Sequence, residues 1–564
     1  MNKIKIVLFG IAAVILTSCA DLNYNEASGR DEKWTYNSPI NGVKALVYDV
    51  YAQMPSEFKD NLYGNGAMIA SATDESEFSL SFSPIHKYYN GGWNPSNPFP
   101  DIWDRSYRAI TQIHMYLERI HKIDLSDYEY DPDYQNMVQQ FEIFPYELRF
   151  LRAYFYFELV RAYGGVPLVT TTLTNEQANR VERASASEVF KFIIDELDAV
   201  AEYLPVSYND IPGQEIGRAT RGAALALKAR ALLYQASPLF NTSGNKALWK
   251  EAAVASKVII DNAQRWGYKF SSYANLWGHD TFTNPEFIFV LGTQASNSFE
   301  QFNYPVGVEN GNSGNCPTQA LVDAYEYQAD GMTFKEKHPG DVDVTDENPY
   351  EGLDPRFELT VVKNGDLWPT NTAQQIPIET YQNGFNGAPK YGATPTGYYL
   401  KKFVDGNCIT TANNQTSTRH NWIVMRLAEV YLNYAEAMYN YYGDADEKGE
   451  FDMSANEAIN ALRNRPDIMM PEFQGSNGFE ERYMRERMVE LAFEGHRFWD
   501  VRRWKKGAEF FKNVDVAEFK LDGSGHLILN RVTKTRQWNE KYNLYPIPQS
   551  EIQNNSNLKQ NPNW

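Results

Sequence analysis

The chain has few cysteines and few histidines. Of its 564 residues, three are cysteine and eight are histidine, and no two cysteines have the Cys-x-x-Cys spacing. This scarcity argues against thiol redox chemistry and against zinc held by paired cysteines. Cys316 and Cys408 lie far apart in loop-like sequence. One disulfide between them and two free thiols both remain open.

Basic charge is also scarce. The formal net charge is −19, and the 53 Lys and Arg residues are scattered among 72 Asp and Glu residues. Binding of a phosphate backbone requires clustered positive charge, so we predict no nucleic-acid partner. The hydrophobic share of 43% and the charged share of 22% are typical of a globular protein.

Familiar catalytic motifs are missing. The sequence has no Gly-x-Ser-x-Gly elbow, no phosphate-binding Walker loop, no Gly-x-Gly-x-x-Gly and no His-Glu-x-x-His. We therefore predict that the chain is not an enzyme. A surface glycosidase stays open as an alternative, because two carboxylates ~5 to 10 Å apart leave no sequence motif.

The only long apolar run lies at the N-terminus. Lys3 and Lys5 precede an apolar segment from Ile6 to Leu16, which a Leu-Thr-Ser-Cys box follows. The run is too short for the ~20 residues of a transmembrane helix, so residues 1–18 are predicted to be a lipoprotein signal peptide. Cys19 is then the predicted lipid attachment site that holds the chain to a membrane, and residues 19–36 a polar tether. An ordinary secretory peptide is the alternative.

Helical periodicity dominates the rest of the chain. In YELRFLRAYFYFELVRAYGG, apolar residues recur every three or four positions and Gly164-Gly165 is a predicted helix end. Alanines in the apolar stripes of several segments favour closely paired helices. The predicted helical ranges are 40–54, 103–123, 146–165, 186–204, 218–236, 246–262, 422–442, 454–465 and 479–506. Long insertions rich in Gly, Pro, Asn and aromatics separate them, with short apolar stretches expected to form hairpins.

Two sets of residues have a spacing that is also found in metal sites. His114, Glu118 and His121 fall on one face if their helix continues, but such spacing is common by chance, and we expect no metal there. Asp341, Asp343 and Asp346 offer oxygen ligands without the glycine that an EF-hand turn needs. We therefore predict no cofactor, with a structural calcium ion at this loop as the alternative.

Charged residues also concentrate in RMVELAFEGHRFWDVRRW. The spacing of three and four residues favours ion pairs within and between helices over a catalytic role. The residues concerned are Glu490, Glu494, His496, Arg497, Asp500 and Arg503.

Several motifs together resemble one family. They are Cys19 with Asp-Leu-Asn behind it, ELRFLRAYFYFELVRAYGGVPLVT at 147–170, RLAEVYLNYAEAMYNYYG at 426–443, RERMVELAFEGHRFWDVRRWKK at 485–506 and the C-terminal LYPIPQSEIQNNSNLKQNPNW. In order and spacing the chain resembles the SusD-like (RagB/SusD) lipoproteins of Bacteroidota. The resemblance implies a mainly α fold, a superhelix of tetratricopeptide-like helix pairs with long irregular loops and a few short β-hairpins. It further implies an N-terminal helical part with binding loops (37–310) and a C-terminal part (311–564).

The same resemblance implies a function at the cell surface. The chain would be lipid-anchored in the outer membrane, facing the exterior, and would capture an oligosaccharide or polysaccharide for a SusC-like TonB-dependent transporter. Peptide capture by the same scaffold and a purely structural lid are the alternatives.

Aromatic residues make up 14% of the chain, and a flat ring stacks well on the apolar face of a sugar. Aromatics in loops are the better ligand candidates, since those on helices are explained as core. Trp93 is the first candidate, with Asp74 as its polar partner, because the family uses loops in these regions. Trp277, Tyr304 and Trp368 are the further candidates.

Overall fold

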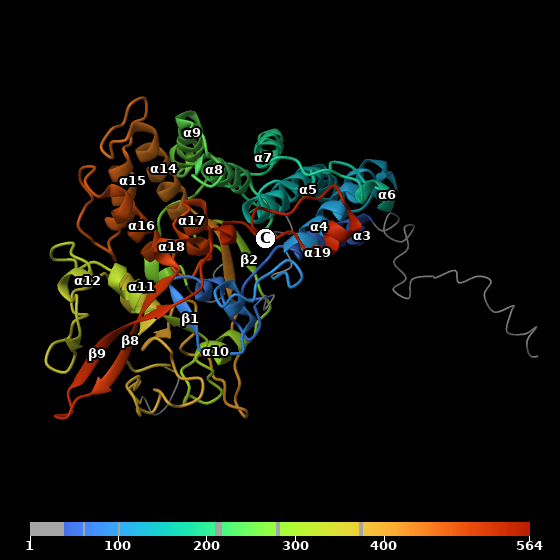
Figure 1. Cartoon of the computed structure of the whole chain (residues 1–564). Helices are drawn as coiled ribbons and strands as arrows, with labels where there is room; N and C mark the ends of the chain where they lie inside the picture. Colours follow the sequence, from blue (N-terminus) through green and yellow to red (C-terminus); the bar gives the residue numbers. More distant parts are fainter. Residues whose placement is uncertain (1–38, 60–62, 100–101, 209–216, 278–281, 371–375) are drawn as a thin grey trace, which may run out of the picture.

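The computed structural model describes residues 39–564 except 60–62, 100–101, 209–216, 278–281 and 371–375. The predicted signal peptide, Cys19 and the tether lie outside the described residues. Helices form one half of the molecule, and loops with short strands form the other (Figure 1). None of the described helices has both the length and the apolar character needed to cross a bilayer.

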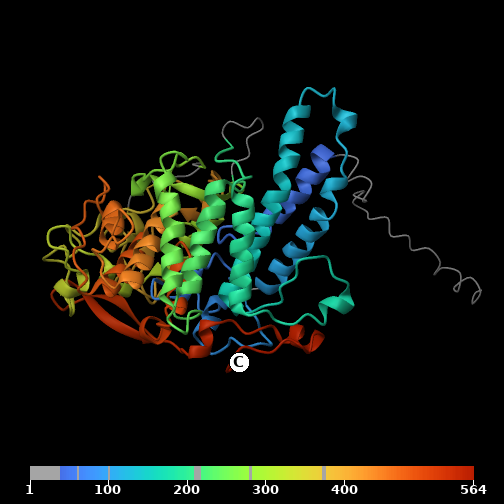
Figure 2. The same cartoon turned by 90° about the horizontal axis from the view of Figure 1, so that it is seen from above.

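The main helices follow one another as neighbours. α4 packs on α5, α5 on α7, α7 on α8, α8 on α9, α9 on α14 and α14 on α15. Viewed from above, α5, α7, α8 and α9 lie side by side (Figure 2). Their bounds are α3 Pro39–Tyr51, α4 Ile102–Leu117, α5 Tyr134–Tyr163, α7 Ala186–Ala201, α8 Arg221–Ala236, α9 Lys246–Asn262, α14 Leu427–Tyr442, α15 Ala455–Arg463, α16 Phe479–Glu490 and α17 His496–Arg503.

Local sequence explains where these helices start and stop. Ser185 and Ser454 begin α7 and α15 with capping boxes, in which Glu188 and Glu457 complete the reciprocal hydrogen bonds. Gly443 ends α14 in the left-handed conformation, at φ 79°. Alanines along α8 are buried where α7 and α9 approach, which confirms the predicted pairing of helices through small residues.

Four predicted helices differ from the structure by more than three residues. The one over 146–165 begins already at Tyr134 as part of α5, and the one over 103–123 ends at Leu117. The predicted helix from Trp422 begins only at Leu427, because Asn421–Arg426 forms strand β7 and pairs with β2 (Phe287–Gly292). The predicted helix over 479–506 is two helices, α16 and α17. Phe493 and Gly495 between them have positive φ values of 61° and 78°, which a continuous helix does not allow.

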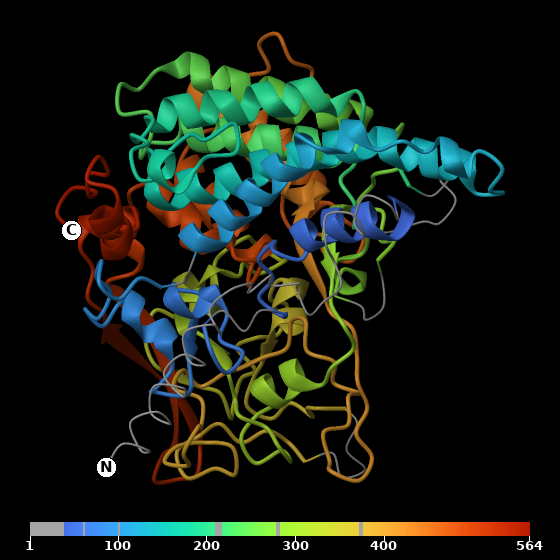
Figure 3. The same ribbon diagram turned by 90° about the vertical axis from the view of Figure 1, so that its right-hand side faces the viewer.

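The strands of the insertions mostly pair over long sequence distances, contrary to the predicted local hairpins. β1 (Ser76–Phe78) pairs with β3 (Asn315–Pro317), and β5 (Val361–Val362) with β6 (Tyr399–Leu400). β8 (Asn513–Leu521) and β9 (Leu527–Thr535) do form a hairpin, which β4 (Val342–Asp343) extends to three strands. These pairings bring loops from both halves of the sequence to one side of the molecule, below the helices in Figure 3.

The charged motif around α16 and α17 lies in the interior. Arg426 contacts Glu286, Glu490 and Glu494 at 2.7 to 2.8 Å, and all four side chains are buried. Arg503 donates hydrogen bonds to Glu436 and Asp500. The prediction of ion pairs between elements is confirmed. The arginines hold the pKa of Glu490 far below its ordinary value, although burial alone would raise it.

Candidate functional site

Trp93 lies in the core and is only 2% exposed. Its indole ring lies 4.6 Å from the ring of Tyr545 and 4.9 Å from that of Tyr88, with Trp564 and Tyr542 also in contact. The predicted stacking of a sugar on this ring needs correction, because other rings already enclose it. Trp93 anchors its loop to the C-terminal segment instead.

Asp74 and Tyr304 are also enclosed. Asp74 accepts two hydrogen bonds from the guanidinium of Arg497, at 2.9 and 2.7 Å. The hydroxyl of the fully buried Tyr304 donates to the backbone oxygens of Asp405 and Cys408. Since both side chains are buried and bonded within the chain, the structure gives them roles in the fold, and not the predicted contact with ligand.

Trp277 and Trp368 are half-buried. The ammonium of Lys402 lies 3.8 Å from the centre of the Trp277 ring, and Trp277 also packs against Phe403. Trp368 packs against core residues that include Cys316, and it precedes a cis proline, Pro369. The ligand contacts predicted for these two tryptophans stay predictions.

The structure also decides how the two cysteines and the set His114, Glu118 and His121 are placed. Cys316 and Cys408 are both buried, and no disulfide joins them. α4 ends at Leu117, so Glu118 and His121 do not continue the helical face of His114. Burial lowers the pKa of His114 to about 4.

The three acids of the predicted calcium loop have different partners in the structure. Asp341 accepts a hydrogen bond from the backbone N–H of Arg531. Asp343 and Asp346 instead approach His526 of the β8–β9 turn, with one ligand atom from each within 4.8 Å of the others. His526 Nδ1 lies 3.1 Å from Asp343 Oδ2, so this imidazole already pairs with one carboxylate.

Three other aromatic side chains are presented to solvent on the loop side. Phe82 is 62% exposed, Phe385 49% and Tyr391 71%. Such grouped apolar side chains on a surface commonly mark an interaction site. We call these three residues the loop aromatics.

Contacts between their loops show that the segments carrying the loop aromatics are neighbours. A Cβ atom at Gly392, next to Tyr391, would lie 3.6 Å from Cδ2 of Leu80, two residues before Phe82. A Cβ atom at Gly307 would lie 2.9 Å from the Phe385 ring. The loop of Gly307 returns to the loop of Leu80, because Ser79 Oγ donates to Asn312 O at 3.0 Å. The ammonium of Lys390 lies 4.1 Å from the centre of the Phe385 ring.

Sequence reasoning did not single out the loop aromatics. They occur in SLSFSP, NGFNGA and PKYGAT, where small, polar and turn-forming residues flank each ring. A single aromatic among turn-forming residues is a usable signal, because it has few apolar neighbours in sequence to pack against. The predictions favoured tryptophans because their large apolar surface suits ligand binding. The same apolar surface favours burial, and Trp93 is buried in the core.

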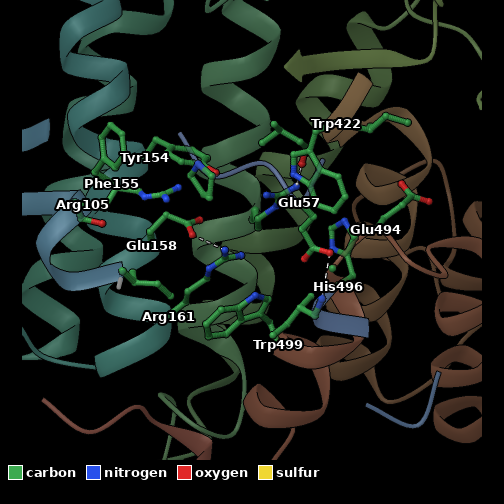
Figure 4. A pocket seen from close by; sticks show the side chains of 18 of the residues that line it. Glu57, Arg105, Tyr154, Phe155, Glu158, Arg161, Trp422, Glu494, His496 and Trp499 are labelled. Atoms are coloured by element: carbon green, nitrogen blue, oxygen red, sulfur yellow. Dashed lines mark hydrogen bonds and ion pairs between the residues drawn. The ribbon is translucent and has the colours of Figure 1, made fainter. Parts of the chain in front are cut away.

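A pocket of about 90 Å³ lies where the helices meet the loops (Figure 4). α4 and α5 supply one wall, and β7 with the α16–α17 junction supplies the other. Trp422 and Trp499 contribute aromatic surface, and the Glu158–Arg161 ion pair of α5 also lines the pocket. The side chains labelled in Figure 4 are Glu57, Arg105, Tyr154, Phe155, Glu158, Arg161, Trp422, Glu494, His496 and Trp499.

Burial sets the charge states in this pocket. It raises the pKa of Glu57 to about 8, although the N–H of Ile69, 3.1 Å from Glu57 Oε2, favours the carboxylate. It also lowers the pKa of His496 to about 4. Both side chains are therefore mainly uncharged at neutral pH. A cavity of ~150 Å³ holds one benzene molecule, so this smaller pocket suits water or a small group and not a sugar ring.

Known proteins with similar sequences support this fold. A model described as the SusD family matches residues 285–564, and a model described as starch-binding associating with outer membrane matches residues 28–233. SusD-like protein P2 of Formosa agariphila is 26% identical over 429 residues, which cover 73% of this chain and 72% of that protein.

Solved structures agree over nearly the whole chain. A SusD-like protein from Bacteroides fragilis matches with a TM-score of 0.75 and 27% identity, covering 95% of this chain and 98% of that one. A SusD-like carbohydrate binding protein from the same species matches with a TM-score of 0.74 and 25% identity, covering 93% and 100%. The order of paired helices, the long loops and these matches together establish that the chain belongs to the SusD family.

Proposed function

We propose that this protein captures an oligosaccharide or polysaccharide at the cell surface and delivers it to a SusC-like TonB-dependent transporter. Its lipid at Cys19 would hold it to the outer membrane, facing the exterior. The single observation that carries the binding proposal is the group of loop aromatics on adjacent loops. The family model whose description names starch binding and the outer membrane supports it.

The chemistry of the loop surface fits a sugar chain. Exposed rings offer flat apolar faces to the C–H groups of a pyranose, and the ammonium of Lys390 can donate to its hydroxyls. Oδ1 of Asn312 can accept from them, whereas its amide hydrogens are bonded within the chain. Three rings, Phe82 on one loop and Phe385 and Tyr391 on another, can contact successive units of a polymer. Each contact is weak, so affinity comes from several of them together.

Affinity electrophoresis tests capture. The chain beginning after Cys19 is run in gels that contain starch, laminarin, xylan or mucin, beside the double variant Phe82→Ala/Tyr391→Ala. We expect retardation by at least one glycan and a loss of about three- to tenfold in affinity for each ring removed. Tyr130→Ala, which removes a 91% exposed ring between α4 and α5, is the matched control and should bind like the unaltered chain.

Other outcomes select the alternatives. Unaltered retardation of the double variant would remove the loop aromatics from the proposal. New reducing ends in the mixtures would favour a glycosidase. Displacement of bound fluorescent peptides, with no glycan retardation, would favour peptide capture.

Anchoring and delivery need separate tests. Cys19→Ala in the full chain should move the protein from the membrane fraction to the soluble fraction. Protease added to intact cells should digest the anchored protein if it faces the exterior. Copurification of a large outer-membrane barrel with the anchored protein is the expected sign of the transporter partner.

A further inference from the structure

A second pocket lies among the helices, away from the loop aromatics. It has a volume of about 260 Å³ and opens between α9, α14, α16 and the end of α17. In Figure 1 these helices gather at the upper left, whereas β1 and α10 (Ser298–Asn303) mark the loop side below. A ligand in this pocket would therefore be remote from the loop surface.

The walls of this helical pocket are aromatic. Trp249 comes from α9, Tyr439 from α14, Tyr483 from α16, and Trp504 directly follows α17. Tyr439 is half-buried, and Phe479 covers part of its ring with a centroid distance of 4.4 Å. A site built from Trp and Tyr offers apolar ring surface. The Trp504 indole N–H and the Tyr483 hydroxyl already donate to Glu436, so these two residues contribute ring surface alone.

Polar groups lie around its mouth. Asn440 and Glu480 are exposed, and Lys506 is half-buried with Nζ 3.4 Å from Glu480 Oε1. Asn440 Nδ2 donates to Glu436 O at 2.8 Å, which leaves its second amide hydrogen and Oδ1 without a hydrogen bond among the described residues. An amide, a carboxylate and an ammonium group at one opening can donate to and accept from adjacent hydroxyls.

The deepest acid is not available to a ligand. Both carboxylate oxygens of Glu436 accept hydrogen bonds, from Arg503, Tyr483 and the Trp504 indole. The base of the helical pocket is therefore fixed and its charge is neutralised. Recognition falls to the rings and to the polar residues of the mouth, which favours a neutral ligand with many hydroxyls.

Size agrees with one sugar ring. A cavity of ~150 Å³ holds benzene, so 260 Å³ leaves room for a six-membered ring with hydroxyl substituents. We propose that the helical pocket binds one sugar unit at the end of a glycan chain, as a second site beside the loop surface. This proposal rests on the proposed carbohydrate function. Two sites on one anchored chain increase the retention of a polymer that reaches both.

Four proteins separate the two sites. They are the unaltered chain, the loop variant Phe82→Ala/Tyr391→Ala, the mouth variant Asn440→Ala/Lys506→Ala, and the combination of both. Each is titrated with maltohexaose, laminarihexaose, xylohexaose and chitohexaose by calorimetry. Trp249 and Trp504 line the helical pocket, so the change in total tryptophan emission is compared with that of a Trp249→Phe/Trp504→Phe variant. The mouth variant changes side chains at the surface, and Tyr130→Ala serves again as the exposed control.

The expected result is residual binding of one hexasaccharide to the loop variant, weakened about three- to tenfold by adding the mouth substitutions. Tyr439→Ala in the loop variant should weaken it similarly, with unchanged far-UV circular dichroism. If the loop variant retains no binding, or if the mouth substitutions leave its affinity unchanged, the helical pocket is not a sugar site. Loss of all binding in the loop variant would still support the loop surface, so the two proposals fail separately.

Discussion

The guanidinium of Arg497 in α17 grips the carboxylate of Asp74 with two hydrogen bonds, Nε to Oδ1 at 2.9 Å and Nη2 to Oδ2 at 2.7 Å. The two residues are 423 positions apart, and both side chains are buried. This pair connects the turn before β1 to the charged interior under the helices. From that turn the chain leads through β1 to the loop of Phe82. Loss of this pair should therefore lower the stability of the fold.

Arg497→Ala should lower the free energy of unfolding by about 3 to 5 kcal/mol, because it leaves Asp74 buried without its partner. Urea unfolding followed by circular dichroism measures the change. The matched control is Arg108→Ala, which removes an exposed pair with Asp104 and should cost less than about 0.5 kcal/mol. Equal effects of the two substitutions would contradict the importance given to burial.

Trp93→Ala should act on stability in the same way, with an expected cost of about 3 to 5 kcal/mol for an aromatic ring removed from a packed core. Trp93→Phe should restore a large part of it by keeping a ring among Tyr88, Tyr545 and Trp564. Thermal unfolding and glycan retardation are measured on the same samples. An alanine variant that is as stable as the unaltered chain but no longer retarded would instead return Trp93 to the binding site.

Glu57 should make stability depend on pH. Because burial raises its pKa to about 8, the folded chain keeps this proton at pH values where the unfolded chain has released it. The stability that Glu57 contributes is complete below pH ~4.5 and is lost as the pH rises to about 8. Glu57→Gln removes the ionisation, so its stability relative to the unaltered chain should rise between pH 5 and pH 8, by about 3 to 4 kcal/mol.

Urea titrations of both proteins at pH 5, 6.5 and 8 measure this difference. Glu176→Gln, which changes an exposed acid paired with Arg180, provides the control and should show little pH dependence. A constant difference across the range would mean that the Glu57 carboxyl is already ionised in the folded pocket.

Gly443→Ala should cost about 1 kcal/mol of stability. Gly443 ends α14 at φ 79°, and a Cβ atom there would meet nothing within 4 Å, so backbone strain is the expected cause. Gly443→Asn should cost less than Gly443→Ala, since asparagine tolerates the left-handed conformation better. If both variants are equally stable, strain at this residue is not what limits the helix end.

Much of the helical scaffold was predictable, because its signals are local. The segment over 246–262 was predicted with the bounds that α9 has, and Gly164 ends α5 as expected. It was predicted that the charged residues of the α16–α17 motif form ion pairs. Their partners were not, since Asp74 and Glu286 approach Arg497 and Arg426 only when distant segments fold together. That residues 421–426 form a strand was not predictable from local patterns, because their partner strand β2 lies 129 or more positions away.

The candidate site was harder to predict for a related reason. A tryptophan in a Gly- and Asn-rich loop reads the same whether it faces solvent or the core, and Trp93 turned out to be enclosed by rings from the far C-terminus. Phe82, Phe385 and Tyr391 stay exposed on loops whose neighbours come from distant parts of the chain, which short sequence patterns do not reveal.

By itself, the sequence determined most of the helices, their order and the family, since periodicity, caps and short motifs act over a few residues. The lipid anchor at Cys19 stays a prediction from the sequence. The tertiary structure decided which aromatics are buried, which carboxylates are paired and where pockets open. Those properties depend on contacts between segments hundreds of residues apart, and burial and pairing of a side chain are fixed only when both partners are in place.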